Sequence, residues 1–171
     1  LNADDRGVFG PNGKPSLSST DAGAQITRTN QSWASGLGTA ATVTYAFRDS
    51  VTTMPTDTTG FSQFNATQIA ATILALAAWS EVANITFQRV QNVGSEFSNQ
   101  ATILLGNYAD GQAGAAAFAY LPGGMPGASG FTQVQGDVWI NSSLSYNASP
   151  ILYGYGTQTL LHEIGHAIGL S

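Results

Sequence analysis

The sequence has no cysteine, few charged residues and no long apolar run. The absence of cysteine excludes a disulfide framework, a thiolate nucleophile and a cysteine-ligated zinc site. Charged residues make up only 9% of the chain, against roughly 25% in an average globular protein. With a formal net charge of −5 and only 5 Lys and Arg, the chain lacks the basic footprint of a nucleic-acid-binding protein. No apolar stretch approaches the roughly 18 residues that a membrane span requires, so we expect none.

The chain has 171 residues, of which 43% are apolar, and this is enough for one domain with a hydrophobic core. Its polarity comes mainly from Asn, Gln, Ser and Thr, together with 20 Gly. Residues 1–18 contain the turn-forming stretches DDRG and FGPNGKPS, so we expect an irregular N-terminal segment there. A short helix is predicted over 19–29.

Five stretches between residues 41 and 143 have strand patterns. They are 41–49, 85–90, 101–108, 114–122 and 136–143. A helix predicted over 65–84 separates the first two strands, which gives a right-handed βαβ unit. With a final helix predicted over 157–170, the order β-α-β-β-β-β-α indicates an α/β or α+β fold with one mainly parallel sheet.

The helix predicted over 65–84 has a clear N-terminal signal. Asn65 can cap it, and Gln68 follows three residues later, as in a capping box. One helical face carries Ile69, Ile73, Leu76 and Ser80. Because alanine fills much of the remainder, the helix is apolar enough to back the sheet by packing against it.

The final predicted helix carries the candidate metal-binding and catalytic residues. The two histidines of the chain, His162 and His166, are four residues apart, so they stack on one helical face and can converge on one zinc ion. Glu163 is adjacent to the first ligand and is poorly placed to be a third one. It can instead reach a metal-bound water and act as a general base, which is the logic of the H-E-x-x-H motif.

A plain structural interpretation competes with this one. A single helical histidine is usually packed or solvated, and a His-Glu pair is often a surface contact. The motif is more specific here because both histidines of the chain fall within it and the rest of the helix is apolar. Gly169, three residues after His166, can end the helix in a left-handed turn, as a third ligand from beyond the helix requires.

The stretch HEIGHAIGLS resembles the metzincin signature H-E-x-x-H-x-x-G-x-x-H, in the form found in serralysins, which are secreted zinc endopeptidases of Gram-negative bacteria. The similarity extends through DDRG, NGKPS, AQITRTNQSW, FSQFNATQIAATILALAAWSEVANITF, GAAAFAYLP and YGTQTLLHEIGHAIGLS in the same order. This resemblance implies that His162 and His166 bind zinc and that Glu163 is the general base. It also implies a metzincin fold, with a five-stranded mixed sheet whose antiparallel edge strand lies above the cleft.

The resemblance further implies features that the sequence does not contain. A third histidine would directly follow Ser171, and a Met-turn and calcium-binding glycine-rich repeats would come later. Residues 1–171 would therefore be an incomplete protease domain that lacks its C-terminal part. The sheet and backing helix would occupy 41–143 and the active-site helix 157–170. The rest of the protease chain would be its partner, calcium would bind the missing repeats, and the protein would be extracellular.

The resemblance implies that AAAFAYL, within the stretch GAAAFAYLP, is the counterpart of this edge strand. Its alternation places Ala116, Phe118 and Tyr120 on one face and Ala115, Ala117 and Ala119 on the other. The first set is bulky enough to pack into the core, whereas the methyl groups of the second allow another backbone to approach. Given the resemblance, we expect residues 115–121 to bind an extended peptide substrate antiparallel through main-chain hydrogen bonds. Without it, an ordinary edge strand with small residues is the simpler interpretation.

Three hypotheses about function remain at this point. The leading one is a zinc endopeptidase of extended protein substrates. The second is a catalytically inactive truncated fragment that persists as a folded binding or structural module. The third is a zinc protease of thermolysin type, with a glutamate from a second helix as third ligand. Gly169 and the chain-wide similarity argue against this third hypothesis.

Overall fold

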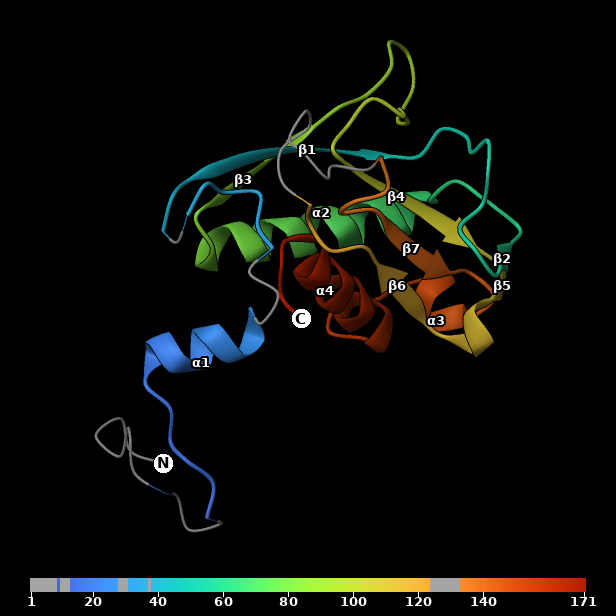
Figure 1. Ribbon diagram of the computed structural model, residues 1–171. Helices are drawn as coiled ribbons and strands as arrows, with labels where there is room; N and C mark the ends of the chain where they lie inside the picture. The colour runs from blue at the N-terminus through green and yellow to red at the C-terminus, as the bar shows by residue number, and fades with distance from the viewer. Residues whose placement is uncertain (1–8, 10–12, 28–30, 37, 124–132) are drawn as a thin grey trace.

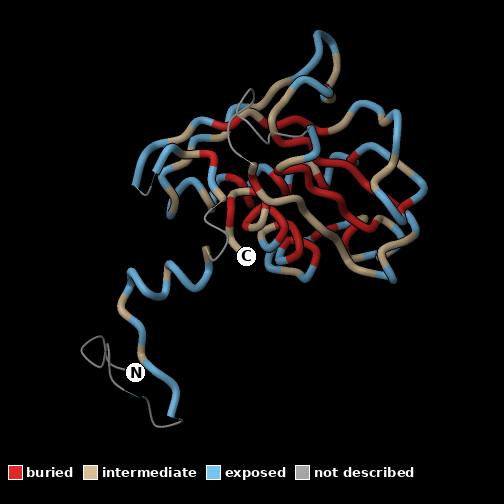
Figure 2. Tube along the Cα trace, viewed as in Figure 1, coloured by how far each residue is buried: buried red, intermediate tan, exposed pale blue. Residues whose placement is uncertain are grey.

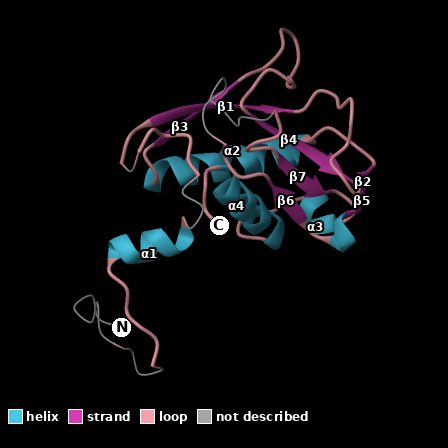
Figure 3. Cartoon of the chain, in the orientation of Figure 1, coloured by secondary structure: helices cyan, strands magenta, loops and turns pink. Residues whose placement is uncertain are grey.

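A five-stranded mixed sheet with two long helices packed on one face forms the body of the protein (Figure 1, Figure 3). The computed structural model describes residues 9, 13–27, 31–36, 38–123 and 133–171. The irregular segment predicted over 1–18 falls largely outside these residues. Within it, Phe9 and Pro15 form an isolated antiparallel bridge.

The sheet has the strand order β3-β1-β4-β7-β6. Its strands are β1 (Ala41–Phe47), β3 (Ile85–Arg89), β4 (Ile103–Tyr108), β6 (Ala117–Ala119) and β7 (Val138–Asn141). β1 pairs parallel with both β3 and β4, and β4 pairs parallel with β7. β6 alone runs antiparallel, at the edge next to β7, with Phe118 opposite Trp139. The predicted mainly parallel sheet with one antiparallel edge strand is therefore confirmed.

The backing helix is α2 (Ala66–Val82), and its capping box is formed as predicted. The side chain of Asn65 accepts from the Gln68 N–H and the side chain of Gln68 accepts from the Asn65 N–H, both at 3.0 Å. The face that carries Ile69, Ile73, Leu76 and Ser80 is not the buried face throughout, because Ile73 is 39% exposed. The buried residues of α2 are Gln68, Ala71, Thr72, Ala75 and Leu76. Gln68 determines this rotation, since its Nε2 reaches into the protein and donates to Asn107 at 2.8 Å.

The active-site helix predicted over 157–170 is α4 (Tyr155–Ala167), which starts two residues earlier and ends three residues earlier. It packs against α2 and β6 on the same face of the sheet. Leu160, Ile164 and Ala167 enter the main core, which joins the inner sheet residues to both helices. Figure 2 shows the buried residues concentrated in α4 and the central strands.

Several smaller elements complete the described chain. They are α1 (Ser19–Ile26), β2 (Thr58–Thr59), β5 (Asp110–Gly111), the 3₁₀ turn η1 (Gln112–Gly114) and α3 (Ser145–Ala148). The strand predicted over 114–122 is shorter in the structure, where β6 covers only Ala117–Ala119 and η1 occupies the first residue of the predicted stretch. α1 has no buried residue and projects from the body (Figure 1, Figure 2). Among the described helices, none has the length and apolar character needed to cross a membrane.

Candidate active site

The two imidazoles lie side by side on α4. Their Nε2 atoms are 3.0 Å apart and their ring planes are nearly perpendicular, at 88°. His162 is exposed and His166 is half-buried, so a ligand can reach the pair from solvent. A zinc–imidazole bond is about 2.0–2.1 Å long. Because the Nε2 separation is less than twice this length, one zinc ion can contact both rings.

The tautomer of His166 is fixed by a main-chain contact. Its Nδ1 lies 2.6 Å from the carbonyl oxygen of Leu170. Since a carbonyl can only accept, Nδ1 carries the proton, and the neutral ring presents its lone pair at Nε2. Such a hydrogen bond behind a histidine orients the ring and raises its basicity as a metal ligand. Spacing alone does not reveal this contact, although the turn at Gly169 is what brings Leu170 back to the helix.

Glu163 lies on the inner side of α4 and is only 7% exposed. Burial raises the pKa of its carboxyl group, and the nearby His166 partly opposes this rise. The carboxylate also lies close enough to Tyr108 to raise the pKa of that phenol, after the larger effect of burial. The glutamate therefore faces the space between the helix and the sheet, with a proton affinity higher than that of an exposed carboxylate.

The helix α4 ends in a turn at Gly169, as the sequence predicts. Gly169 has φ +115°, a conformation open to glycine but strained for other residues. The Leu170 N–H donates to Gly165 O at 2.9 Å and the Gly169 N–H to His166 O at 3.0 Å. These two bonds form a Schellman motif, which turns the chain sharply away from the helix. The left-handed turn predicted at Gly169 is thus confirmed.

Gly169→Ala is expected to lower the free energy of unfolding by about 1–3 kcal/mol, because of backbone strain. A Cβ at this position would also overlap the carbonyl oxygen of Gln31, so the substitution displaces the neighbouring chain. Thermal unfolding measures the loss. Gly23→Ala in α1 is the matched control, since a Cβ there meets no described atom within 4 Å, and its melting temperature should equal or exceed that of the wild type. Equal melting temperatures for Gly169→Ala and the wild type would contradict the strained turn.

The edge strand β6 presents a defined set of main-chain groups. The Asn141 N–H donates to Ala116 O and the Tyr120 N–H donates to Asp137 O, both at 3.0 Å. In an antiparallel ladder such bonds recur at every second residue, so residues 116, 118 and 120 exchange hydrogen bonds with the β7 side. Ala117 and Ala119 consequently direct their N–H and C=O groups toward the open edge.

The side chains of β6 alternate as predicted, but the faces are assigned differently. Ala117 and Ala119 pack against the main core on the helix side of the sheet. Phe118 lies on the opposite face, where it contacts Tyr108 and Tyr120 with ring centroids 5.5 Å and 5.9 Å apart. The prediction that the bulky set alone enters the core is therefore wrong. Small residues are required on the helix side because α4 packs directly against β6.

A polar cluster behind β6 fixes the start of the strand. The carbonyl oxygen of Ala115 accepts from the Tyr108 hydroxyl at 2.6 Å and from Asn141 Nδ2 at 3.0 Å. The carbonyl oxygen of Ala116 accepts from Asn147 Nδ2 at 2.7 Å. Two of the predicted substrate-binding residues thus have inward-facing carbonyls. No sequence pattern points to Tyr108, Asn141 or Asn147, because their partners lie on other elements and asparagine is common throughout the chain.

Within the described ranges, no group of three or more His, Cys, Asp and Glu side chains is placed to hold one metal ion. The imidazole pair of α4 is therefore the candidate metal-binding unit in this part of the chain. The third hypothesis from the sequence required a glutamate from a second helix beside the two histidines. The described residues do not bring one there.

The fold and the motif together define a class of protein. A mixed five-stranded sheet has its antiparallel edge strand beside a helix with the sequence H-E-x-x-H-x-x-G, and a glycine turn ends that helix. This combination is that of a metzincin catalytic domain.

Known proteins place the chain within this class. Residues 39–171 match the model of the matrixin family of peptidases. Serralysin A of Dickeya chrysanthemi is 43% identical over 164 residues, which cover 94% of this chain and 33% of that protein. Metallopeptidase AprA of Pseudomonas marginalis is 40% identical over 166 residues, covering 94% and 32%. The chain belongs to the matrixin family and is a metzincin of the serralysin type. It spans about a third of the length of these relatives.

Proposed function

We propose that the protein containing this chain is a zinc-dependent endopeptidase that hydrolyses extended protein substrates outside the cell. The observation that carries the proposal is the pair of Nε2 atoms 3.0 Å apart, with the buried Glu163 on the same helix and the open edge of β6 beside it. The similarity to a protein named a metallopeptidase supports the same activity. Calcium, expected from the resemblance, would bind repeats outside the present sequence.

His162 and His166 would hold the zinc ion through Nε2, and the bond from His166 Nδ1 to Leu170 O keeps one ring in the required tautomer. Zinc, when bound, supplies a Lewis acid that polarises the scissile carbonyl and acidifies water. Glu163 accepts a proton from the attacking water as its oxygen bonds to the carbonyl carbon. The glutamate then delivers that proton to the departing amine nitrogen as the C–N bond breaks. Burial raises the pKa of Glu163, so its carboxylate takes up the proton of the water more readily than an exposed carboxylate would.

Substrate binding would use the outward-facing main chain of β6. An extended peptide that adds antiparallel to this edge can exchange hydrogen bonds with Ala117 and Ala119, whose N–H and C=O groups point away from β7. Main-chain bonds do not distinguish among side chains, so we expect cleavage to be broad in sequence. The inward bonds from Tyr108, Asn141 and Asn147 keep the strand in place while the peptide docks.

Proline at Ala117 or Ala119 should lower kcat/KM for long peptides by about tenfold. It removes the N–H that would donate to the peptide, a hydrogen bond that contributes roughly 0.5–1.5 kcal/mol, and it places a pyrrolidine ring at the open edge. Zinc content and the melting temperature should remain close to wild type, since neither N–H belongs to the ladder with β7. Steady-state kinetics with long and short peptides measure the effect, which should be smaller for short ones.

Proline at Phe118 is the matched control for this strand. Its N–H faces β7, so the substitution breaks the ladder and should destabilise the protein rather than act on substrate alone. Unaltered kinetics for long peptides with proline at both alanine positions would mean that the peptide binds elsewhere.

The proposed activity is tested with the full-length protein. Its zinc content is measured on the same sample as hydrolysis of a denatured protein substrate, before and after removal of zinc with a chelator. We expect one zinc per active site, hydrolysis that stops on chelation, and recovery when zinc is added. If the protein is stably folded but cleaves no peptide bond, whether or not it binds zinc, the alternative of an inactive binding or structural module is favoured.

A further inference from the structure

Two of the three tryptophans in the chain donate hydrogen bonds to the active-site helix. Trp33 Nε1–H donates to Ala167 O at 2.8 Å, and Trp79 Nε1–H donates to Leu161 O at 3.0 Å. The two acceptors adjoin the candidate metal ligands in sequence. Leu161 directly precedes His162, and Ala167 directly follows His166. The two indoles thus hold α4 on either side of the imidazole pair.

The bond from Trp33 completes the C-terminus of α4. The last four carbonyls of a helix have no partner within it. Three of them accept main-chain N–H groups here, with Ile168 donating to Ile164 O, Leu170 to Gly165 O and Gly169 to His166 O. The fourth, Ala167 O, accepts the indole of Trp33, which is only 3% exposed. An unpaired buried carbonyl would be costly, so this side chain holds the helix end in place.

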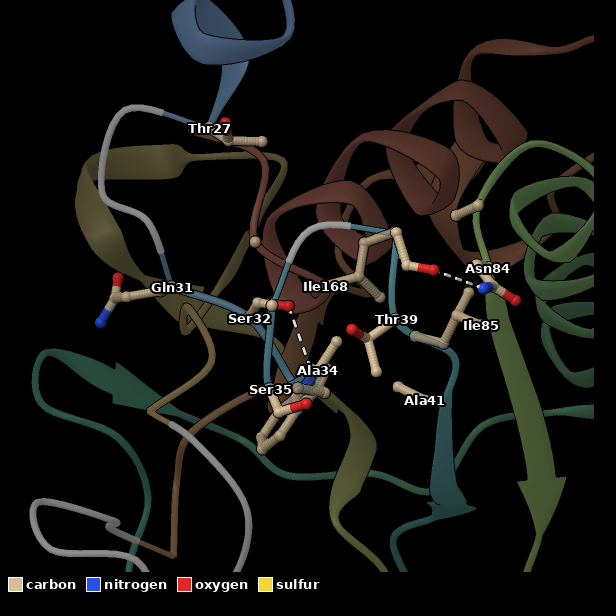
Figure 4. A pocket seen from close by; sticks show the side chains of 15 residues that line it. Thr27, Gln31, Ser32, Ala34, Ser35, Thr39, Ala41, Asn84, Ile85 and Ile168 are labelled. Atoms are coloured by element: carbon tan, nitrogen blue, oxygen red, sulfur yellow. Dashed lines mark hydrogen bonds between the residues drawn. The ribbon is translucent and has the colours of Figure 1, made fainter.

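The same N-terminal part of the chain also holds the turn after the helix. The Ser171 N–H donates to Ile26 O at 2.8 Å, and Gln31 O lies where a Cβ on Gly169 would be. This contact fixes the turn that presents Leu170 O to His166 Nδ1. Figure 4 shows the junction, where Gln31 and Ile168 are among the residues around a pocket of about 430 Å³. The orientation of His166 therefore depends on a segment more than 130 residues earlier.

Trp79 holds α4 from the neighbouring helix α2. α2 and α4 pack closely, and a Cβ at Gly165 would lie 3.1 Å from the Trp79 ring. Gly165 stands between His162 and His166 in the sequence, so the indole rests on the turn that joins the two candidate ligands. Its N–H then fixes this turn by its bond to Leu161 O.

We infer that Trp33 and Trp79 are positioning residues for the metal site, which set its zinc affinity by holding the peptide groups next to the two histidines. The inference rests on the proposed function, since it assumes that the imidazole pair binds zinc. A helix held just before His162 and just after His166 keeps the two Nε2 atoms convergent before the metal arrives. Less of the binding free energy is then spent on ordering the ligands.

The third tryptophan provides the matched control. Trp139 in β7 is 2% exposed, about as buried as Trp33, and its buried Nε1 has no hydrogen-bond partner among the residues that the structure describes. Replacing it with Phe perturbs packing to a similar degree but removes no bond to α4. If Trp33 acted only through packing, its Phe variant and that of Trp139 would lower the zinc affinity alike.

The experiment compares W33F, W79F and W139F in the full-length protein. Zinc affinity is measured by competition with a chromogenic chelator, cobalt coordination by the visible absorption of the Co²⁺-loaded protein, and folding by the melting temperature of the metal-free protein. We expect W33F and W79F each to bind zinc about tenfold more weakly, the effect of losing one hydrogen bond, with an altered cobalt spectrum. W139F should match the wild type in both metal measurements, even if all three variants melt earlier.

Zinc affinity unchanged in W33F and W79F, or lowered equally in W139F, would overturn the inference. If W33F does not fold, the test rests on W79F, because Trp79 is only half-buried. The proposed function fails separately, and visibly, if the wild-type protein itself binds no zinc. If the wild-type protein binds zinc and the variants bind it equally well, only the role given to the two indoles is excluded.

Discussion

Replacing Glu163 with Gln in the full-length protein is expected to lower kcat for peptide hydrolysis by about 10²–10⁴-fold, the usual contribution of a positioned base. The amide cannot accept a proton from water, so the attack loses its base and the departing amine loses its proton donor. The substitution keeps the size of a side chain that is only 7% exposed, and no ligand nitrogen changes. Zinc content should therefore equal that of the wild type.

The decisive comparison is between activity and metal content in the same preparation. Gln158→Ala, at an exposed position on the same helix, is the control and should retain both. Near-full activity of the Glu163→Gln protein would show that the glutamate is not the base. Loss of zinc together with activity would instead show that the carboxylate matters for the metal site itself.

His162→Ala and His166→Ala are expected to lose zinc and activity together, because each removes one of the two imidazoles that face a common point. Metal analysis after dialysis measures the first loss and peptide hydrolysis the second. Full zinc occupancy in either variant would count against a site on α4. Zinc should also leave the wild-type protein as pH falls, since protons compete for the imidazole nitrogens that must be neutral to bind it.

The metal-free forms of these two variants should differ in stability. His162 is exposed and, among the described residues, its side chain bonds only to His166, so its truncation should change the free energy of unfolding by less than about 0.5 kcal/mol. His166 also holds Leu170 O, so its loss should cost about 0.5–1.5 kcal/mol. Equal melting temperatures for the two metal-free variants would contradict the contact assigned to His166 Nδ1.

Much of the local structure follows from the sequence alone. The capping box at Asn65 and Gln68, the turn at Gly169 and the five strand patterns were all predictable, because each depends on residues a few positions apart. The same holds for the stacking of His162 and His166 on one helical face. A helix fixes the i, i+4 relation whatever surrounds it. The sequence by itself therefore determined the class of site and the residues proposed to carry it.

The tertiary structure alone decided how these parts are oriented. The alternation in GAAAFAYLP indicated two faces, but only pairing with β7 shows that Ala117 and Ala119 turn their main chain outward. The apolar pattern of α2 left its rotation open, and the buried bond from Gln68 to Asn107 selected it. Trp33 and Ala167 are 134 residues apart, so no local pattern could reveal their contact. Propensity and periodicity act over one or two turns of chain, whereas long-range hydrogen bonds form only once packing has brought their partners together.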